Sequence, residues 1–184
     1  LKIKKIESVT NHDVKAVEYF IADFFKKDKQ LKKYINLIHY GLTSEDVNSL
    51  SYAIMINNGI KDYLEYIQNL NKILKTLSSK WKSIPLLSRT HGQAASPTTI
   101  GKELKVFQLR ISKEINTLKN IKPLAKFSGA TGNYHTFEIT NNKINWPAIN
   151  SRFIKSFGVN QNPITTQIEP HDWIAEMSHS IIRI

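Results

Sequence analysis

Two stretches of this chain carry apolar residues at steps of three and four over several helical turns, and this periodicity limits the folds open to it. The first stripe runs from Ile60 to Trp81 and the second from Ile100 to Leu118. Steps of three and four place side chains on one face of a helix. Helices this long exceed the usual globular length and pack lengthwise in bundles. The sequence therefore predicts an all-α, long-helix bundle.

Shorter helical segments flank the two long ones. Residues 14–25 are also periodic, a helix is predicted to begin near Trp146-Pro147 and end before Gly158, and the segment from about residue 168 has a helical pattern. A chain of 184 residues can bury such stripes fully only with more helices than these. We therefore expect further sequence or neighbouring subunits to cover the rest.

Two helix starts are predicted from their capping residues. Thr43 is followed by Glu45 and Asp46, and acidic side chains in a first turn complement the helix dipole. Ser96-Pro97 is interpreted as an N-cap followed by proline at the first helical position. The surrounding residues 83–97 and 128–145 lack helical periodicity and are predicted as polar connectors, the second as loop or short extended structure.

Composition narrows the classes of partner. The net charge of +11 fits sequence drift toward lysine, an anionic metabolite, or nucleic acid. Only four arginines occur, and guanine-reading proteins rely on arginine. Cysteine is absent, which excludes disulfides and thiolate metal sites and suits a cytoplasmic protein. The sequence contains no run of about 18 apolar residues, so no membrane span is predicted. It also lacks the H-x-x-x-H and H-E-x-x-H spacings, so no metal site is predicted.

Polar side chains gather in four places along the chain. In order, these are His12 with Asp13; His39 with Thr43 and Ser44; Arg89 with Thr90, His91 and Gln93; and Thr166 with Gln167, Glu169 and His171. Each has a structural interpretation as well as a functional one. His12 and Asp13 suit a helix cap, and His91 taken alone suits a loop histidine satisfied by the backbone.

Taken together, these clusters favour a site for a charged small molecule. A helix start with unpaired N–H groups and the hydroxyls of Thr43 and Ser44 suits carboxylate or phosphate oxygens. An imidazole that holds a proton, as His91 does in this interpretation, can release it to a leaving atom as a general acid.

Five segments together carry a family resemblance that extends from residue 10 to the end of the chain. They read TNHDVKAVEYF, HYGLTSEDVN, SRTHGQAASPTTIGKEL, GATGNY and NPITTQIEPHDWIAE. In this order they resemble the adenylosuccinate lyase family of the fumarase/aspartase superfamily, and most closely its bacterial form. The resemblance implies part of a subunit whose long helices form a tetrameric core. It divides the chain into the end of an N-terminal helical domain, residues 1–43, and the first part of the central bundle domain, residues 44–184.

The resemblance also implies a reaction. It is β-elimination of fumarate from adenylosuccinate, which leaves AMP, and from a succinylated aminoimidazole carboxamide ribotide. No cofactor or metal is required, and the expected partners are the purine nucleotide, fumarate and three further copies of the subunit. The resemblance further implies active sites that are shared among three subunits. It also implies a cytoplasmic protein that binds neither membranes nor nucleic acid.

Individual residues take roles through their match to the family motifs. His91 matches the general acid. The positions matching substrate contacts are His12, Asp13, His39, Thr43, Ser44, Arg89, Thr90 and Gln167. This chain has Ala94 where many relatives have proline, and it contains no serine loop of the S-S-x-M-P-x-K-x-N type that supplies the family's base. We therefore expect residues 1–184 to be an internal piece that shows no elimination activity alone.

Three alternatives stay open at the level of sequence. One is another lyase of the fumarase/aspartase superfamily. A basic helical module that binds nucleic acid would account for the charge, and its oligonucleotide affinity would fall steeply with salt. A scaffold that kept the bundle and lost the chemistry would self-associate without binding AMP or fumarate; the retained His12, His39, His91 and Gln167 argue against it.

Overall fold

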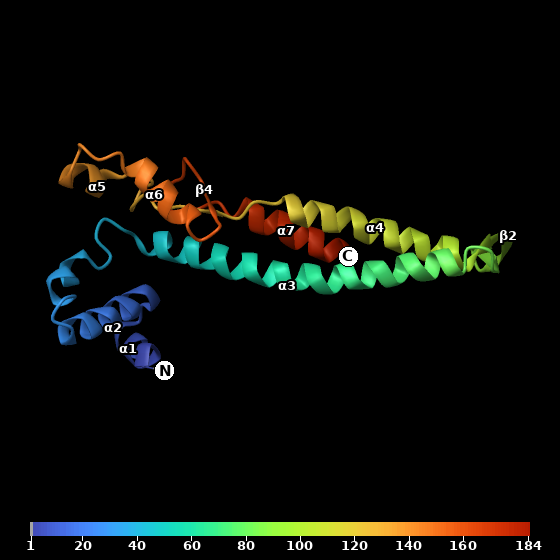
Figure 1. Cartoon of the computed structure of the whole chain (residues 1–184), viewed down its shortest axis with the longest axis horizontal. Coiled ribbons are helices and arrows are strands. Elements are labelled where there is room, and N and C mark those ends of the chain that lie inside the picture. The colour runs from blue at the N-terminus through green and yellow to red at the C-terminus, as the bar shows by residue number, and fades with distance from the viewer. Residues whose placement is uncertain (1) are drawn as a thin grey trace. The chain divides into compact units, whose positions relative to one another are not determined.

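The computed structural model describes residues 2–184 and is mostly helical, as predicted (Figure 1). The helices are α1 (Lys2–Thr10), α2 (Asp13–Lys27), the 3-10 helix η1 (Lys32–Leu37), α3 (Ser44–Lys80), α4 (Ile100–Asn120), α5 (His135–Thr140), α6 (Trp146–Lys155) and α7 (Asp172–Arg183). The strands are β1 (Pro85–Thr90), β2 (Gln93–Thr99), β3 (Leu124–Ala125) and β4 (Asn160–Gln161). The chain forms two compact units.

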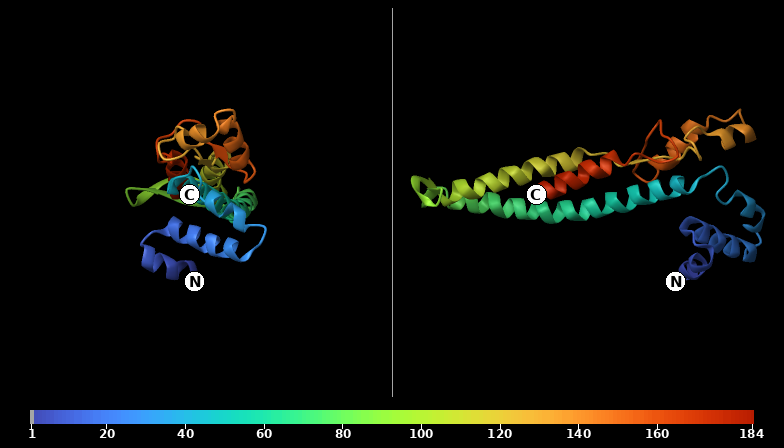
Figure 2. Two further views of the ribbon diagram at one scale, coloured as in Figure 1. Left: turned by 90° about the vertical axis from the view of Figure 1, so that its left-hand side faces the viewer. Right: turned by 180° about the vertical axis from the view of Figure 1, so that it is seen from behind.

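Unit 2 contains residues 55–122 and 171–184, and is built on the two long helices. The later part of α3 lies beside α4, and α7 lies along them (Figures 1 and 2). Ile67 of α3 packs with Ile111 and Ile115 of α4 in a buried cluster, as the two predicted stripes require. The side chains that cover this cluster are Tyr63, Leu64, Leu74 and Ile184.

A polar contact interrupts the seam between α3 and α4. The amide of Asn71 donates to the hydroxyl of Ser112 at 2.9 Å, and the amide of Gln108 donates to both Ser112 and Asn71 at 2.7 and 3.2 Å. Gln108 is buried. Because these groups satisfy one another only in one alignment, they favour a single register of the two helices.

Part of each apolar stripe remains open in this chain. Leu70 of the first stripe is 44% exposed, and Phe107 of the second is 55% exposed. The expectation that this chain cannot bury its stripes fully is therefore confirmed for the described residues.

Residues 83–97, predicted as a connector, do join α3 to α4, and they form a β-hairpin that the sequence had not indicated. β1 and β2 pair antiparallel, with Thr90 opposite Gln93. The two residues between them, His91 and Gly92, have φ angles of +50° and +76°. Positive φ at both central residues is the geometry of the tight hairpin turn that matches strand twist. Most side chains of both strands are exposed, so no alternation of apolar and polar residues marked them.

The predicted cap at Ser96 was wrong, because Ser96 and Pro97 belong to β2. Helix α4 begins at Ile100, and the side chain of Thr99 accepts the N–H of Lys102 at 3.1 Å. The prediction at the other start is confirmed, since Ser44 is the first residue of α3.

Unit 1 consists of the residues up to Ile54 together with Pro123–Pro170. It holds the shorter helices and the parallel pair β3–β4. Helices α2 and α6 match their predicted ranges. Residues 128–145, predicted without helix, contain the short α5, where Phe137 is buried and packs 5.1 Å from Trp146 between ring centroids. Burial of one aromatic side chain stabilises a turn that periodicity could not reveal.

Candidate functional site

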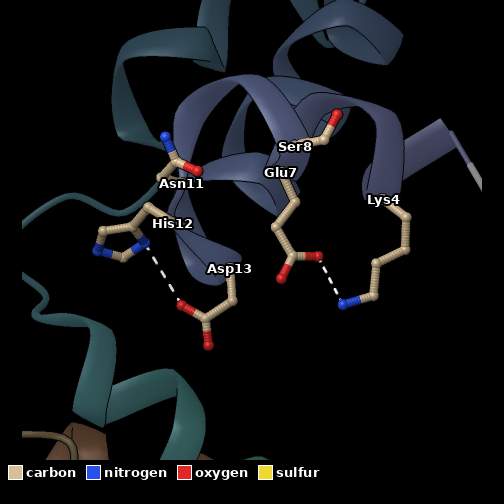
Figure 3. A pocket seen from close by; sticks show the side chains of 6 residues that line it. All are labelled: Lys4, Glu7, Ser8, Asn11, His12 and Asp13. Carbon is tan, nitrogen blue, oxygen red and sulfur yellow. Dashed lines mark ion pairs between the residues drawn. The ribbon is translucent and has the colours of Figure 1, made fainter.

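The start of α2 is capped by a predicted site residue. His12 has an extended backbone, and its Nδ1 accepts the N–H of Lys15 at 3.2 Å. Asp13 Oδ1 accepts the N–H of Val14 at 2.7 Å. Both side chains line a pocket of about 720 Å³ beside α1, where Figure 3 shows them turned toward each other. The capping interpretation is confirmed for His12, and its contact with substrate stays a prediction.

His39 lies between η1 and α3 in the left-handed region, with φ +61°. Its Nδ1 lies 3.3 Å from Oε1 of Glu18 on α2, and the two side chains are 20% and 14% exposed. Non-glycine residues hold this backbone conformation where the surrounding structure imposes it, often at functional sites. Sequence reasoning missed Glu18, because no spacing rule links residue 18 with residue 39.

Thr43 and Ser44 are half-buried at the start of α3. The backbone N–H of Thr43 donates to Oδ2 of Asp46 at 2.9 Å, and the N–H of Asp46 donates back to the carbonyl of Thr43 at 3.0 Å. This reciprocal bonding fixes the direction of the first turn of α3. It holds both candidate hydroxyls in place at a helix N-terminus.

Asp46 is also the centre of a buried ionic cluster. Its Oδ1 lies 2.7 Å from Nζ of Lys126, and both side chains are fully buried. The carboxylate accepts the N–H groups of Ser128 and Gly129 at 2.9 and 3.1 Å, while Nζ of Lys126 donates to the Gly129 carbonyl at 2.7 Å. Ser49 hydrogen-bonds with the backbone of Lys126. We call these five residues the Asp46 cluster; it joins the Thr43 segment to the GATGNY segment.

The segment that carries Gln167 packs on the same loop. Gly132 has φ +80°, and a Cβ there would clash with the carbonyl of Thr165. The amide of Asn162 donates to Glu169 Oε1 at 3.0 Å, and Gln161 donates to the hydroxyl of Tyr134. Gln167 itself is exposed on this segment. Three motifs far apart in sequence therefore meet within unit 1.

The SRTHGQ motif forms the tip of the hairpin in unit 2. Arg89 Nη1 donates to the carbonyl of Gly92 at 3.4 Å, while Thr90 and His91 are exposed at the turn. The hairpin tip, defined here as residues 89–93, thus presents a guanidinium, a hydroxyl and an imidazole together. A missed signal was His-Gly itself, because glycine at the second turn position is typical of two-residue hairpins.

The structure sorts the predicted residues between the two units. Unit 1 contains His12, Asp13, His39, Thr43, Ser44 and Gln167, and unit 2 contains Arg89, Thr90 and His91. Across residues 2–184, no three His, Cys, Asp or Glu side chains group closely enough to hold a metal ion. Within that same range, no helix combines the length and apolar character needed to cross a bilayer.

Comparison with solved structures defines the class of fold. A fumarate lyase from Mesorhizobium sp. BNC1 superposes with a TM-score of 0.83 at 18% identity, covering 99% of this chain and 41% of that one. A beta-carboxy-cis,cis-muconate cycloisomerase from Acinetobacter calcoaceticus sp. ADP1 gives 0.79 at 17% identity, with the same coverage of each chain. The fold is therefore that of the fumarate lyase type.

The family model described as "Lyase" matches residues 1–184, and the chain belongs to this lyase family. An adenylosuccinate lyase of Buchnera aphidicola (subsp. Schizaphis graminum) is 43% identical over 96% of this chain and 39% of its own length. Those of Haemophilus influenzae and Escherichia coli K12 are each 42% identical over 99% of this chain and 40% of their own length. The resemblance to adenylosuccinate lyases is confirmed. The chain spans about 40% of the length of these relatives.

Proposed function

We propose that the whole protein is an adenylosuccinate lyase that releases fumarate from adenylosuccinate and from the succinylated aminoimidazole carboxamide ribotide. The observation that carries this proposal is the 42–43% identity of almost the entire chain to relatives of that name. The proposed location is the cytoplasm, and no cofactor takes part. The boundary at residue 43 between an N-terminal and a central domain belongs to the same proposal.

In the proposed reaction a base removes a proton from the succinyl carbon next to the carbon that bears nitrogen. The electron pair of that C–H bond forms the C=C bond of fumarate. The C–N bond then breaks, its electron pair stays on nitrogen, and His91 donates a proton to that nitrogen. General acid catalysis of this kind requires an imidazole that can reach the leaving atom, and the exposure of His91 at the hairpin tip supports the proposal.

The substrate is a di-carboxylate with a phosphate, and the proposed contacts match its chemistry. Thr43 and Ser44 offer hydroxyls and a helix N-terminus to an anionic oxygen. Arg89 offers a guanidinium, and Gln167 offers an amide that can both donate and accept. His12 and Asp13 contribute from the pocket beside α1.

We propose a homotetramer whose active sites combine residues from several subunits. Apolar side chains left open on unit 2 support this assembly. Leu86 and Leu87 of β1 are 41% and 53% exposed, and Phe107 and Leu109 of α4 are more than half exposed. Large apolar side chains left exposed on both β1 and α4 are what an interface with another subunit would cover. Sedimentation of the whole protein should give a tetramer.

Fumarate release measured by ultraviolet absorbance tests the function. The whole protein should act on adenylosuccinate, whereas residues 1–184 alone should show no turnover because the serine-loop base is absent. Release of fumarate from malate or aspartate instead would favour another lyase of the superfamily. Tight oligonucleotide binding without elimination would favour the basic nucleic-acid-binding module.

A further inference from the structure

Glu18 contacts two titratable side chains from different parts of unit 1. Its Oε2 accepts a hydrogen bond from Nζ of Lys15 at 2.7 Å, and its Oε1 faces Nδ1 of His39 at 3.3 Å. The bond to Glu18 raises the pKa of Lys15 above its ordinary value. His39 Nδ1 therefore faces the second oxygen of a carboxyl group whose first oxygen is bound by the Lys15 ammonium.

A carboxylate beside one imidazole nitrogen determines where the ring proton lies. Histidine placed this way keeps its proton on the nitrogen that faces the carboxylate, which fixes both the tautomer and the ring orientation. For His39 that nitrogen is Nδ1. The other nitrogen, Nε2, then carries a lone pair and accepts hydrogen bonds.

His12 has the opposite arrangement. Its Nδ1 accepts the N–H of Lys15 at 3.2 Å, so this nitrogen carries no proton while the cap is formed. Asp13 Oδ1 lies 3.4 Å from the same nitrogen, but that contact needs a proton on Nδ1 and would remove the cap. The cap is the shorter contact, and Asp13 Oδ1 already accepts the N–H of Val14. In the capped state the proton of neutral His12 lies on Nε2.

We propose that Glu18 is a positioning residue for His39: it holds the imidazole proton on Nδ1 and leaves Nε2 as an acceptor, whereas His12 presents Nε2–H as a donor. The inference rests on the proposed function, in which both histidines serve the substrate site. It assigns them different ligand groups. His39 would receive an N–H or O–H of the substrate, such as a sugar hydroxyl, and His12 would donate to an anionic oxygen.

Solid-state ¹⁵N NMR of the whole protein labelled with ¹⁵N-histidine tests the proton positions directly. Spectra recorded at about pH 8.5, where an unperturbed histidine is neutral, would be compared with those of His12→Asn and His39→Asn to assign the two rings. Asparagine suits both positions, because it is a good N-cap and tolerates positive φ. The His39 signals should show a proton on Nδ1 alone, and the His12 signals a proton on Nε2 alone.

Three variants on α2 distinguish the effect of the Glu18 charge from the effect of its acceptor oxygen and from any general effect of changing this helix. Glu18→Met should move the His39 proton to Nε2 and lower kcat/KM roughly tenfold to a hundredfold, as loss of an orienting partner does. Glu18→Gln keeps an acceptor oxygen, so it should retain the tautomer and lose less activity. Asp23→Asn removes an exposed carboxylate of the same helix, paired with Lys26, and should change neither readout.

Circular dichroism confirms that each variant is folded before the comparison is made. A proton on Nε2 of His39 in the unaltered protein would overturn the proposal, as would Glu18→Met leaving both the tautomer and kcat/KM unchanged. Failure of the proposed function has a different signature. In that case the protein releases no fumarate, while the NMR spectra still decide whether Glu18 positions His39.

Discussion

The Asp46 cluster and the hairpin tip are both rich in polar groups. These groups are buried and paired in the Asp46 cluster, whereas they are exposed at the hairpin tip. In the Asp46 cluster every charge is buried and paired, and the carboxylate also accepts three backbone N–H groups. At the hairpin tip, Arg89 donates to a backbone carbonyl at 3.4 Å, and the side chains of Thr90 and His91 are exposed. A satisfied buried cluster fixes structure, whereas exposed groups on a tight turn are available to a ligand.

This contrast divides the expected effects of mutation. Changes in the Asp46 cluster should act on the free energy of unfolding, because a buried charge that loses its partner is costly. Changes at the hairpin tip should act on turnover and leave stability near its original value. The division fails if a His91 variant loses mainly stability, or if a Lys126 variant loses mainly turnover.

The largest effect is expected at the hairpin tip. His91→Gln should lower kcat for fumarate release by about 10²–10⁴-fold, the range typical of losing a general acid. The free energy of unfolding should change little, since the His91 side chain is exposed. Near-normal turnover of this variant would remove His91 from the role of acid. Thr98→Ser, on β2 of the same hairpin, keeps a hydroxyl and serves as the control for folding of the hairpin.

The second effect is expected in the Asp46 cluster. Lys126→Met leaves the Asp46 carboxylate buried without its cation and should lower the free energy of unfolding by about 3–5 kcal/mol. Urea unfolding of the whole protein measures the loss. The matched control is the double variant Asp46→Asn with Lys126→Met, which removes both charges and should recover part of that stability. If the single variant were as stable as the original protein, the cluster would not anchor the loop.

The third effect concerns the junction between hairpin and α4, where the sequence indicated the wrong cap. Thr99→Ala should cost about 1 kcal/mol, because it removes the side chain that accepts the Lys102 N–H. Ser96→Ala should cost close to nothing, since Ser96 lies in β2. Urea midpoints of the two variants decide the matter, and the reverse order would restore Ser96 as the cap.

The sequence predicted what depends on local spacing. Apolar residues at three- and four-residue steps located α2, α3 and α4, because those steps follow from helix geometry alone. The start of α3 was predictable because Glu45 and Asp46 lie in the first turn after Thr43. The hairpin was missed, because its strands are exposed and the His-Gly of its turn is a weaker signal than the commoner Asn-Gly.

The candidate site shows the same division. Family motifs identified His12, His39, Thr43 and Gln167, and the structure places all four in unit 1. The residues that hold the site in place could not be found from the sequence, because they pair with partners far away along the chain. Asp46 contacts Lys126, and Glu18 contacts His39, through tertiary packing that no spacing rule describes.

The smallest effect is expected at Glu114 in unit 2, a carboxylate that is intermediate between the Asp46 cluster and the hairpin tip. Glu114 accepts the hydroxyl of Ser180 at 2.8 Å and lies 3.0 Å from Arg183. The hydrogen bond from Ser180, followed by Arg183, lowers the pKa of Glu114 below its ordinary value of 4.5. A lowered folded-state pKa contributes stability that is present above the ordinary value and is lost as pH falls through the folded-state value.

Glu114→Gln should therefore lower the urea midpoint at about pH 7, and the deficit should shrink at an acidic pH below the ordinary value of 4.5, as the original protein loses the same contribution. Glu65→Gln, an exposed change on α3 with the same loss of charge, corrects for the general effect of net charge. A deficit that stayed equal at both pH values would mean that Glu114 acts through packing and hydrogen bonding alone. A deficit that shrinks would place it between the two extremes, as a paired charge at the edge of the core whose stabilising effect depends on pH.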